Sequence, residues 1–447
     1  MSQYVYINAN PGVTPVLPYN TPETGAPSFS YVMDNGGNSY LKGTYTAPPP
    51  IVQVVGGAPI LEYKTGIINI GYGYADSLQW QAYPGTGRPV VKLQPLSGFI
   101  FGTSTGPWPS QIKGLTFMKD CSSQDASNYM LGFALRNDSY LFTVDECEFY
   151  EILYTSFTGG DSAIMNLGGY IPGIWVRDCL FRNLAHCAFR SYAANIGETS
   201  WITNCTFVNA GKWSDGTYDP SALRVSSPQS DDFRNNVYLN DATDAHAIQN
   251  VSVGGGITTD YALTDGSMTT PFSGSNVNNP THWLQESPQY INIDATNFRL
   301  KGTSPCRGYG VVTGYNRDFY DTARDGTAYD IGATTYITQA WNTAPAKDGT
   351  ARISTIYDKD RFATLASSDP YFDTDVEINK IDVFYYDSSN RQLKRVIHQG
   401  DPLTGNATWG PIARDGTWHC HQVRLQDGEG ATNMLDGTLF PDFSFVI

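Results

Sequence analysis

Five short stretches of this chain align on one another, and each carries an aromatic residue at the same place. These aromatic residues are Phe117, Phe149, Phe181, Phe207 and Tyr238, and they follow one another at spacings of 32, 32, 26 and 31 residues. A repeat of roughly 20 to 50 residues is typical of stacked architectures, in which each unit buries its apolar face only against its neighbours. The repeat therefore limits the chain to folds that are built by stacking.

The position two residues before the aromatic one is also shared, and in a strand residues two apart face the same side. We therefore expect two interior ladders, one of small side chains and one of rings. The small ladder is Leu115, Cys147, Cys179 and Cys205, and the ring ladder is Phe117, Phe149, Phe181 and Phe207. The apolar residue that opens each repeat has the opposite parity, so we expect it at a bend before the strand. One coil of roughly 30 residues cannot bury its own apolar face, so neighbouring coils must stack at roughly 4.8 Å, and the sequence predicts an all-β protein whose main domain is a parallel β-helix solenoid.

Composition narrows the classes of function. The net charge is −15, and no cluster of Lys or Arg offsets it locally, so nucleic acids and anionic membrane surfaces are expected to be repelled. No run of about 18 apolar residues is present that could span a membrane. The opening residues lack the basic and apolar regions of a secretory signal. We therefore expect a protein made in a cytoplasm, with no nucleic-acid partner and no membrane span.

The seven cysteines are expected to be reduced core residues. Three of them occupy one ladder position, which suits small apolar side chains. A structural metal site would need paired spacings such as Cys-x-x-Cys, and the sequence contains none. We predict neither a metal site nor a cofactor.

Residues 1–58 differ from the rest of the chain because they are rich in proline and tyrosine. Proline keeps a chain extended and removes backbone donors, whereas a disordered linker would be poor in aromatic residues. We predict an extended anchoring arm that docks onto another subunit or a larger assembly. The alternative is a segment that lies on its own solenoid.

The solenoid is expected to cover residues 59–335, and its last part resembles a known closing coil. Phe298, Leu300, Ser304 and Pro305 are followed by Asp318, Asp321, Arg324 and a final stretch from Asp330 to Ala333. This order is similar to the closing coil of right-handed parallel β-helix proteins with the pectate-lyase-like fold. In those proteins the usual sequence pattern is F-x-L-x-x-x-S-P, then D-x-x-G-x-x-R, then D-I-G-A. Two residues depart from it: Cys306 replaces a more usual Ala, and Asp321 replaces the Gly of the turn.

Beyond a polar linker at 336–350, residues 351–447 are expected to form a separate β domain. Alternating apolar residues cover 376–385, and a late Gly-x-Trp stretch ends in Trp418. This part resembles a bacterial immunoglobulin-like β-sandwich, a resemblance that says little about function.

Catalytic residues are harder to find. Glycoside hydrolysis needs two carboxylates at about 5 Å or roughly 6.5 to 9.5 Å, and the insert at 211–220 offers Asp215 and Asp219 next to Trp213 and Tyr218. We take these four residues as a candidate glycan-binding site, the alternative being a solvated turn. The motifs of polygalacturonases and the calcium carboxylates of pectate lyases are missing, and no histidine lies in a known nucleophile motif. We predict no catalytic residue.

The arm, the solenoid and the terminal sandwich together resemble bacteriophage tailspikes, tail fibres and β-helical capsid decorations. The resemblance implies a virion structural protein, commonly a homotrimer, that contacts other virion proteins through its arm and displays a rigid β-helix to host surface polysaccharide. Two alternatives remain: a tailspike depolymerase, acting as a glycosidase or lyase on capsule or lipopolysaccharide, and a bacterial surface adhesin.

Overall fold

The computed structural model divides the chain into two compact units, which we describe one at a time. The first comprises Met1–Pro288 and Pro305–Thr335, and the second comprises Gln289–Ser304 and Tyr336–Ile447. The residues that the structure describes are 4–10, 14–15, 19–35, 38–41, 49–63, 66–70, 78–93, 97–101, 110–120, 133–135, 142–152, 163–166, 174–184, 187–191, 200–211, 221–225, 231–241, 245–251, 256–274, 276–292, 297–300, 304–324, 326–336, 363–365, 378–387, 392–399, 407–409, 417–427, 432–436 and 444–446.

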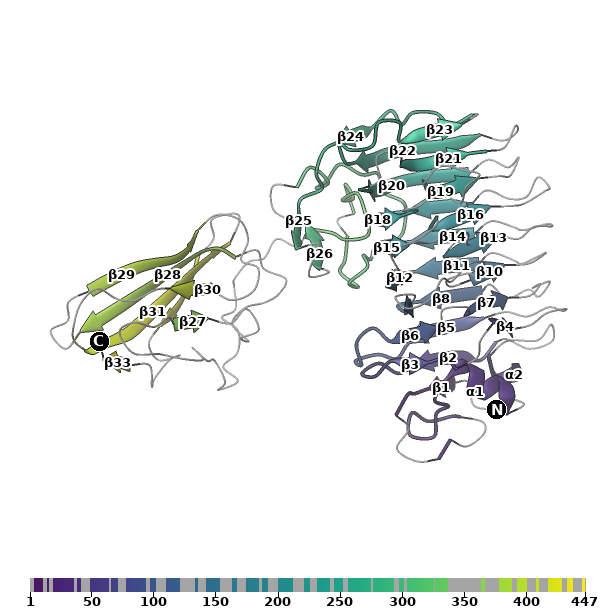
Figure 1. The fold of residues 1–447 in the computed structure, drawn as a ribbon, viewed down its shortest axis with the longest axis horizontal. Helices are drawn as coiled ribbons and strands as arrows, with labels where there is room; N and C mark the ends of the chain where they lie inside the picture. Colours follow the sequence, from purple (N-terminus) through teal and green to yellow (C-terminus); the bar gives the residue numbers. More distant parts are fainter. Residues whose placement is uncertain are drawn as a thin grey trace. The chain divides into compact units, whose positions relative to one another are not determined.

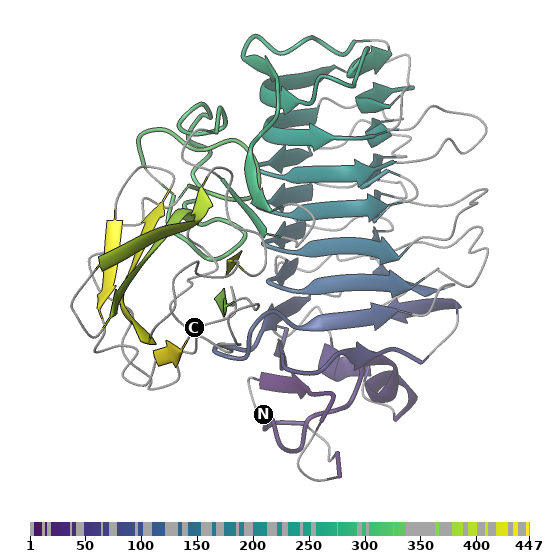
Figure 2. The same cartoon turned by 60° about the vertical axis from the view of Figure 1, so that its left-hand side comes forward.

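The first unit is a parallel β-solenoid, which confirms the predicted fold class (Figures 1 and 2). Each coil contributes up to three strands, and each strand pairs in parallel with the equivalent strands of the coils before and after it. We call the three columns of strands lane 1, lane 2 and lane 3. Lane 3 is an 8-stranded sheet, so the described part of the stack contains eight coils.

The lanes are made of short strands. Lane 1 contains β2 (Ile51–Val54), β5 (Gln79–Ala82), β8 (Ser110–Lys113), β11 (Phe142–Asp145), β14 (Ile174–Arg177) and β17 (Trp201–Thr203). Lane 2 contains β3 (Ile60–Leu61), β6 (Val90–Leu93), β9 (Thr116–Asp120), β12 (Glu148–Ile152), β15 (Leu180–Leu184), β18 (Thr206–Ala210) and β24 (Trp283–Gln285). The longer β20 (Asp231–Leu239) and β22 (Ile257–Thr264) run through both lanes. Lane 3 contains β4 (Gly66–Ile70), β7 (Ser97–Phe101), β10 (Phe133–Leu135), β13 (Ile164–Asn166), β16 (Phe189–Ser191), β19 (Ser221–Val225), β21 (His246–Asn250) and β23 (Phe272–Gly274).

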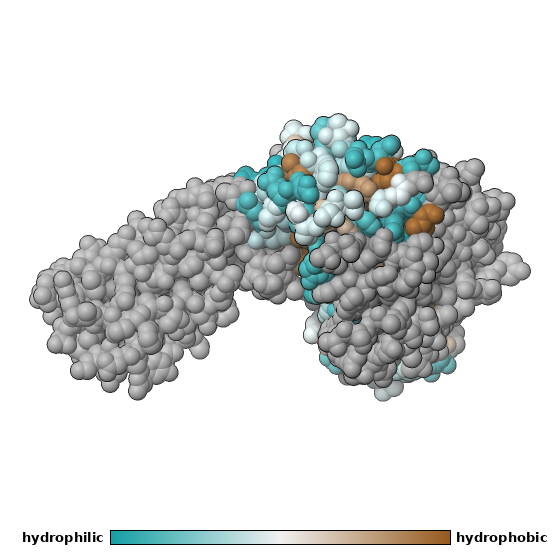
Figure 3. Space-filling view, turned by 45° about the horizontal axis from the view of Figure 1, so that its top comes forward, coloured by the Kyte–Doolittle hydropathy of each residue, from teal (hydrophilic) through white to brown (hydrophobic). Residues whose placement is uncertain are grey.

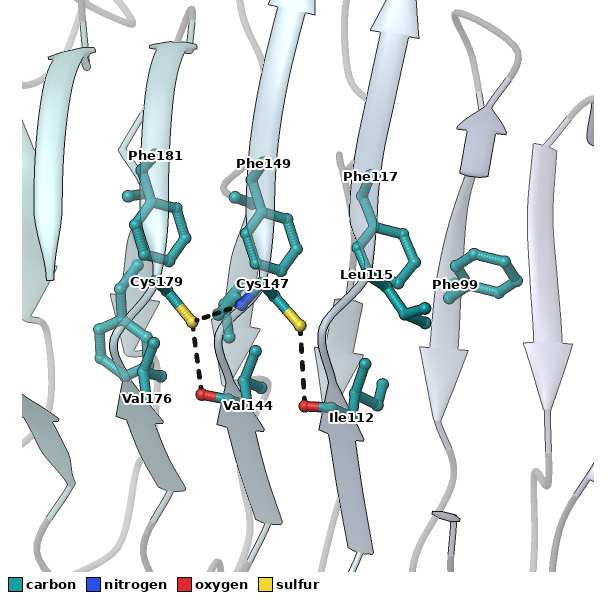
Figure 4. Packing of buried hydrophobic residues seen from close by; sticks show 14 of the residues in the cluster. Phe99, Ile112, Leu115, Phe117, Val144, Cys147, Phe149, Val176, Cys179 and Phe181 are labelled. Carbon is teal, nitrogen blue, oxygen red and sulfur yellow. Dashed lines mark hydrogen bonds between the residues drawn. The ribbon is translucent and has the colours of Figure 1, made fainter. Parts of the chain in front are cut away.

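The ring ladder lies in the interior of lane 2 (Figure 4). Phe149 stacks on Phe117 with ring centroids 5.4 Å apart, and on Phe181 at 5.0 Å. Phe207 continues the column at 5.0 Å from Phe181, and Tyr238 extends it by one more coil at 5.0 Å. All of these rings are fully buried. The column therefore forms a continuous apolar spine over successive coils.

The small ladder lies beside the rings, with Leu115, Cys147, Cys179 and Cys205 all at 0% exposure. The thiols bond to the backbone of neighbouring coils: the Cys179 thiol accepts from the Cys147 N–H at 3.3 Å and donates to the Val144 carbonyl at 3.4 Å (Figure 4). Burial raises the pKa of the Cys147 thiol well above its ordinary value. A thiol held in this neutral form is a poor nucleophile, so these cysteines act as core residues.

The expected bend lies two residues later than the sequence predicted. Val144 belongs to β11 and is fully buried, and so is Cys147 three residues on. Both can face inward because Glu146, between them, has a left-handed backbone with φ of 53°, which breaks the alternation of a continuous strand. The equivalent corner residues also have positive φ, and they are Gly114, Asp178, Asn204, Asn235 and Tyr261. We call this column, together with Glu146, the corner column.

The described N-terminal residues pack on the first coils. β1 (Tyr4–Ile7) pairs in parallel with β2, and the short helices α1 (Phe29–Asp34) and α2 (Asn38–Leu41) follow. The Phe29 ring stacks on Trp80 at 4.2 Å, and the Trp80 indole N–H donates to the Leu41 carbonyl at 3.0 Å. These contacts cover the open end of the apolar interior.

A buried carboxylate attaches this cap to the solenoid. Glu62, which follows β3, accepts hydrogen bonds from the backbone N–H groups of Phe29 at 2.8 Å and Ser30 at 2.9 Å, two of the N–H groups that a helix start leaves unsatisfied. Within the chain, the described residues of the predicted arm pack on their own solenoid, and docking onto another subunit or a larger assembly stays a prediction. Proline content indicated an extended chain but not the tertiary contacts that fold it back, and the stacked strands begin at Ile51 instead of residue 59.

The opposite end of the stack is shown in Figure 3, where the described residues form a mainly hydrophilic surface with a few hydrophobic residues among them. Here Trp283 packs edge-on against Phe272 at 5.5 Å, and its indole N–H donates to Thr264 at 2.9 Å. Trp283 thus covers part of the last coil.

Residues 305–335, which we call the closing segment, return along the outside of the corner column. The Val311 N–H donates to the Asn235 side chain at 2.9 Å, and the Gly332 N–H donates to the Asn235 carbonyl at 2.8 Å. A side chain at Gly310 would come within 2.9 Å of the Asn235 amide oxygen, so this close approach requires glycine. The closing segment therefore covers polar corner residues that the stack alone would leave open.

An ion pair buried on both sides fixes the closing segment. Arg324 and Asp178 each have side chains at 0% exposure, and the Arg324 Nε lies 2.9 Å from Asp178 Oδ1. Arg324 also donates to the carbonyls of Asp330 at 3.1 Å and Gly332 at 2.8 Å. Each charge is therefore paired and hydrogen-bonded, as a buried charge requires.

The two departures from the closing-coil pattern fit the structure. Asp321 occupies the left-handed region with φ of 61°, a conformation that Asp tolerates better than most residues. Asp318 organises this turn by accepting from the N–H groups of Tyr320 at 2.9 Å and Thr322 at 2.7 Å. Cys306 is fully buried, consistent with a small core residue.

The described strands of the second unit are antiparallel. β25 (Tyr290–Asn292) pairs with β26 (Asn297–Leu300), and β27 (Ala363–Leu365) pairs with β30 (Ala407–Trp409). A 5-stranded sheet contains β28 (Ile378–Asp387), β29 (Gln392–Gln399), β31 (Thr417–Asp427), β32 (Thr432–Asp436) and β33 (Ser444–Val446). The immunoglobulin-like arrangement stays a prediction. Within the described residues of the whole chain, no helix is both long and apolar enough to cross a membrane.

We predict that Phe181→Ala lowers the free energy of unfolding by about 3 to 5 kcal/mol, because it removes one ring from the buried column and leaves a cavity. Urea unfolding would measure this loss. Leu61→Ala is the control, since Leu61 is 61% exposed, and it should change stability by less than about 0.5 kcal/mol. A loss below about 1 kcal/mol for Phe181→Ala would show that this ring does not belong to a buried, stabilising column.

Breaking the buried ion pair should also be costly. We predict that Arg324→Ala lowers the free energy of unfolding by about 3 to 5 kcal/mol, because Asp178 would stay buried without its cation. The matched control is Arg317→Ala, which removes an exposed pair with Asp321 and should cost less than about 1 kcal/mol. Equal effects of the two variants would show that the closing segment does not depend on this pair.

Candidate functional site

The outer surface of lane 1 carries aromatic and polar side chains that the pairing of its strands places in register. Its inward positions, such as Val144 and Val176, are buried, so the residues between them face outward. Two outward rows follow from the pairing. One row is Gln111, Thr143, Trp175, Trp201 and Asp232, and the other is Lys113, Asp145, Arg177, Thr203 and Arg234. We call this surface the lane-1 face.

Two tryptophans are adjacent on this face. Trp175 of β14 pairs in register with Trp201 of β17, and their rings meet edge to face with centroids 5.3 Å apart. Both side chains are partly exposed. The Trp175 indole N–H is buried and has no hydrogen-bond acceptor among the residues that the structure describes. Large apolar surface left open on a rigid scaffold is a mark of binding sites.

An ion-pair network supports the Trp175 side of the face. Arg177 bonds Asp145 through Nε at 2.7 Å and Nη2 at 2.9 Å, and Gln111 donates to the same carboxylate at 2.8 Å. The Arg177 guanidinium also lies 5.1 Å from the Trp175 ring centroid and 4.3 Å from that of Tyr315. Planar stacking of this kind favours Arg over Lys. Arg177 is thereby held between two rings.

The closing segment contributes to this network through Tyr315. Its hydroxyl donates to Glu146 at 2.6 Å, and Lys113 lies 3.1 Å from the same carboxylate oxygen. Burial and the hydrogen bond to Glu146 raise the pKa of Tyr315, so it stays neutral. The corner column and the lane-1 face are thus joined by one polar network.

The carboxylates at the other end of the face are paired as well. Asp232 lies 2.7 Å from Arg234, and Asp260 of β22 accepts from the His282 N–H at 2.8 Å and contacts its ring nitrogen at 3.1 Å. Burial alone would raise the pKa of Asp260, but the hydrogen bonds from His282 outweigh it and hold the pKa below its ordinary value. A general acid at neutral pH needs the opposite shift.

The site residues predicted from the sequence are not those of the lane-1 face. Trp213, Asp215, Tyr218 and Asp219 lie outside the described residues, so the proposed glycan contact at that insert stays a prediction. Trp175 and Trp201 were missed although a signal existed. Each stands one residue before the apolar residue that opens its repeat, and extending the alignment of the repeats by one position would have placed them side by side.

No metal centre is apparent in the described part of the chain, where no three His, Cys, Asp or Glu side chains come together.

Comparisons with known proteins add little beyond the fold. No protein-family model matches the sequence, and no curated protein matches it. Among solved structures, the chain is similar to the pectate lyase Pel9A, with 12% identity, coverage of 75% of this chain and 96% of that chain, and a TM-score of 0.39. A likeness at this level says nothing about activity.

The lane-1 face is suited to binding rather than to acid–base chemistry. Its rings offer apolar surface, and the partly exposed Gln111 offers a neutral amide group. Its carboxylates Asp145 and Asp232 are each paired with an arginine. A rigid, extended surface of this composition fits a long hydroxyl-rich ligand.

Proposed function

We propose that this protein is a non-catalytic, glycan-binding structural protein of a bacteriophage particle. In this role the solenoid is a rigid mount, and its lane-1 face holds a polysaccharide of the host surface. The observation that carries the proposal is the pair Trp175 and Trp201, in register on the outside of the stack. The apolar face of a sugar ring packs well on an indole ring, while the hydroxyls at its edge remain available for hydrogen bonds.

The geometry of the stack supports a polymer rather than a small ligand. Successive coils are spaced at roughly 4.8 Å, so a chain that lies along the stack can contact side chains of several coils at once. Gln111 lies in the same row as the two tryptophans and is partly exposed, so its amide oxygen can accept a hydrogen bond from a sugar hydroxyl. Because the scaffold is rigid, little conformational entropy is lost on binding.

The non-catalytic character rests on the pairing of the acids. Asp145 is bonded twice by Arg177, and Asp232 is paired with Arg234. A carboxylate whose oxygens are hydrogen-bonded to a guanidinium is occupied within the protein and is poorly placed to act on a glycosidic bond. The rival function is a depolymerase whose acids come from other parts of the chain.

The particle setting is the part of the proposal that rests on architecture alone. A stacked rod, a second β unit and a surface poor in charge suit a virion tailspike, fibre or head decoration, assembled as a homotrimer in the host cytoplasm. Any contact with other virion proteins through the N-terminus would involve the surface of the cap on the first coils.

We predict that Trp201→Ala weakens polysaccharide binding by about 5- to 150-fold, since loss of one stacked aromatic ring is worth on the order of 1 to 3 kcal/mol. Affinity electrophoresis in gels that contain dextran, mannan, glucomannan, polygalacturonate, alginate or hyaluronate would measure it. The control is Tyr150→Ala, which removes a partly exposed ring of lane 2 that is stacked on Arg182 and should leave binding unchanged. If the wild-type protein binds none of the six glycans, the proposal is contradicted.

The same samples test for catalysis. Incubation of the wild-type protein with each bound polysaccharide is expected to release neither reducing ends nor unsaturated products. Steady release of either product would show that the protein is a depolymerase and would contradict the non-catalytic role.

A further inference from the structure

We infer that the lane-1 face selects uncharged glycans and excludes acidic ones. This inference rests on the proposed function and names the chemical class of its ligand. It is argued from the pairing of charges on the face and from what the face leaves available to a ligand.

Each of the three cations in the two outward rows is already matched by a carboxylate of the protein. Arg177 pairs with Asp145, Lys113 with Glu146 and Arg234 with Asp232. Asp260 adds a further negative charge at the C-terminal end of the face. The face therefore has no excess positive charge to offer, in contrast to sites that bind carboxylate or phosphate groups through Arg and Lys.

The inner pairs cannot be opened for a ligand without a large penalty. The Asp145 side chain has 0% exposure, and that of Glu146 has 5%. An acidic sugar that drew Arg177 or Lys113 away would leave a buried carboxylate without its cation, which is strongly unfavourable. These two cations therefore hold the protein's own acids and are not available as ligand contacts.

The outer pair is more open but does not favour an anion either. Arg234 is 41% exposed and Asp232 is 20% exposed, so the pair itself is weak. A ligand carboxylate that approached Arg234 would come equally close to Asp232 and would be repelled by it. The net charge of −15 adds repulsion of an acidic ligand within about 8 Å of the surface. Beyond that distance, salt at physiological concentration largely screens it.

What remains for a ligand is neutral. The rings of Trp175 and Trp201 are partly exposed, and stacking of sugar on an indole does not depend on ligand charge. The partly exposed amide of Gln111 adds a neutral polar group to this surface. Binding through such groups depends little on salt, whereas binding through ion pairs weakens steeply as salt rises.

The test compares neutral and acidic polysaccharides at two salt concentrations. Wild-type protein is examined by affinity electrophoresis with dextran, mannan and glucomannan on one side and polygalacturonate, alginate and hyaluronate on the other, in about 0.05 M and 0.5 M salt. We expect binding to at least one neutral glycan, with less than about a twofold change in the dissociation constant between the two salts and loss of binding on Trp201→Ala. We expect no retention by the acidic glycans.

A charge variant gives a second, independent readout. Asp232→Asn removes the carboxylate beside Arg234 and should create retention by at least one acidic glycan, which should disappear in the higher salt. The matched control is Asp321→Asn, which releases Arg317 from a comparable exposed pair on the closing segment, away from the face. It should produce no such gain.

The outcomes separate the two proposals. Acidic-glycan binding by the wild type that falls steeply with salt and is lost on Trp201→Ala would overturn the neutral selectivity but keep the lane-1 face as the binding site. Acidic-glycan binding that survives Trp201→Ala would overturn both. Absence of binding to every glycan would overturn the proposed function itself, and an equal gain in Asp232→Asn and Asp321→Asn would overturn the role of the Asp232 pair.

Discussion

The left-handed residue at the corner of six successive coils, from Gly114 to Tyr261, is the constraint on which this solenoid depends. Val144 and Cys147 are three residues apart, and in a continuous strand they would face opposite sides. With Glu146 in the left-handed region, both point into the core, so lanes 1 and 2 share one apolar interior. The corner residue must then point its own side chain outward, which explains why polar residues recur there. The closing segment supplies hydrogen-bond partners for the polar corner residues Asp178, Asn204 and Asn235.

Much of this fold could be predicted from the sequence, but only where the signal is local or periodic. The ladders were visible because the ring recurs in every repeat and, in three of the five, a thiol stands two residues before it. The position of the corner was predicted wrongly because the alternation of apolar and polar residues does not reveal that Glu146 has a positive φ. The N-terminal cap was missed for another reason: the bond from Phe29 to Glu62 and the stacking of Phe29 on Trp80 are tertiary contacts, and proline content reports only local stiffness.

The candidate site illustrates the same limit. A search for acids next to aromatics within one stretch of chain leads to Asp215 and Trp213, because local composition is all that it can use. Trp175 and Trp201 are 26 residues apart and become neighbours only when coils are stacked in register. In a solenoid, the binding surface lies across the repeats, so the useful sequence signal is a residue type that recurs at one repeat position.

The closing segment also links the fold to the lane-1 face. Arg324 fixes the segment on Asp178, and nine residues earlier Tyr315 stacks on Arg177, which in turn lies against Trp175. Arg177 is committed to Asp145 and to two rings at once, so its position leaves it little freedom to bind a ligand. Its contribution is to keep the indole of Trp175 in place. The same pairing that stabilises the solenoid therefore also sets the chemistry of the face, since cations that are used inside the protein cannot attract an anion from outside.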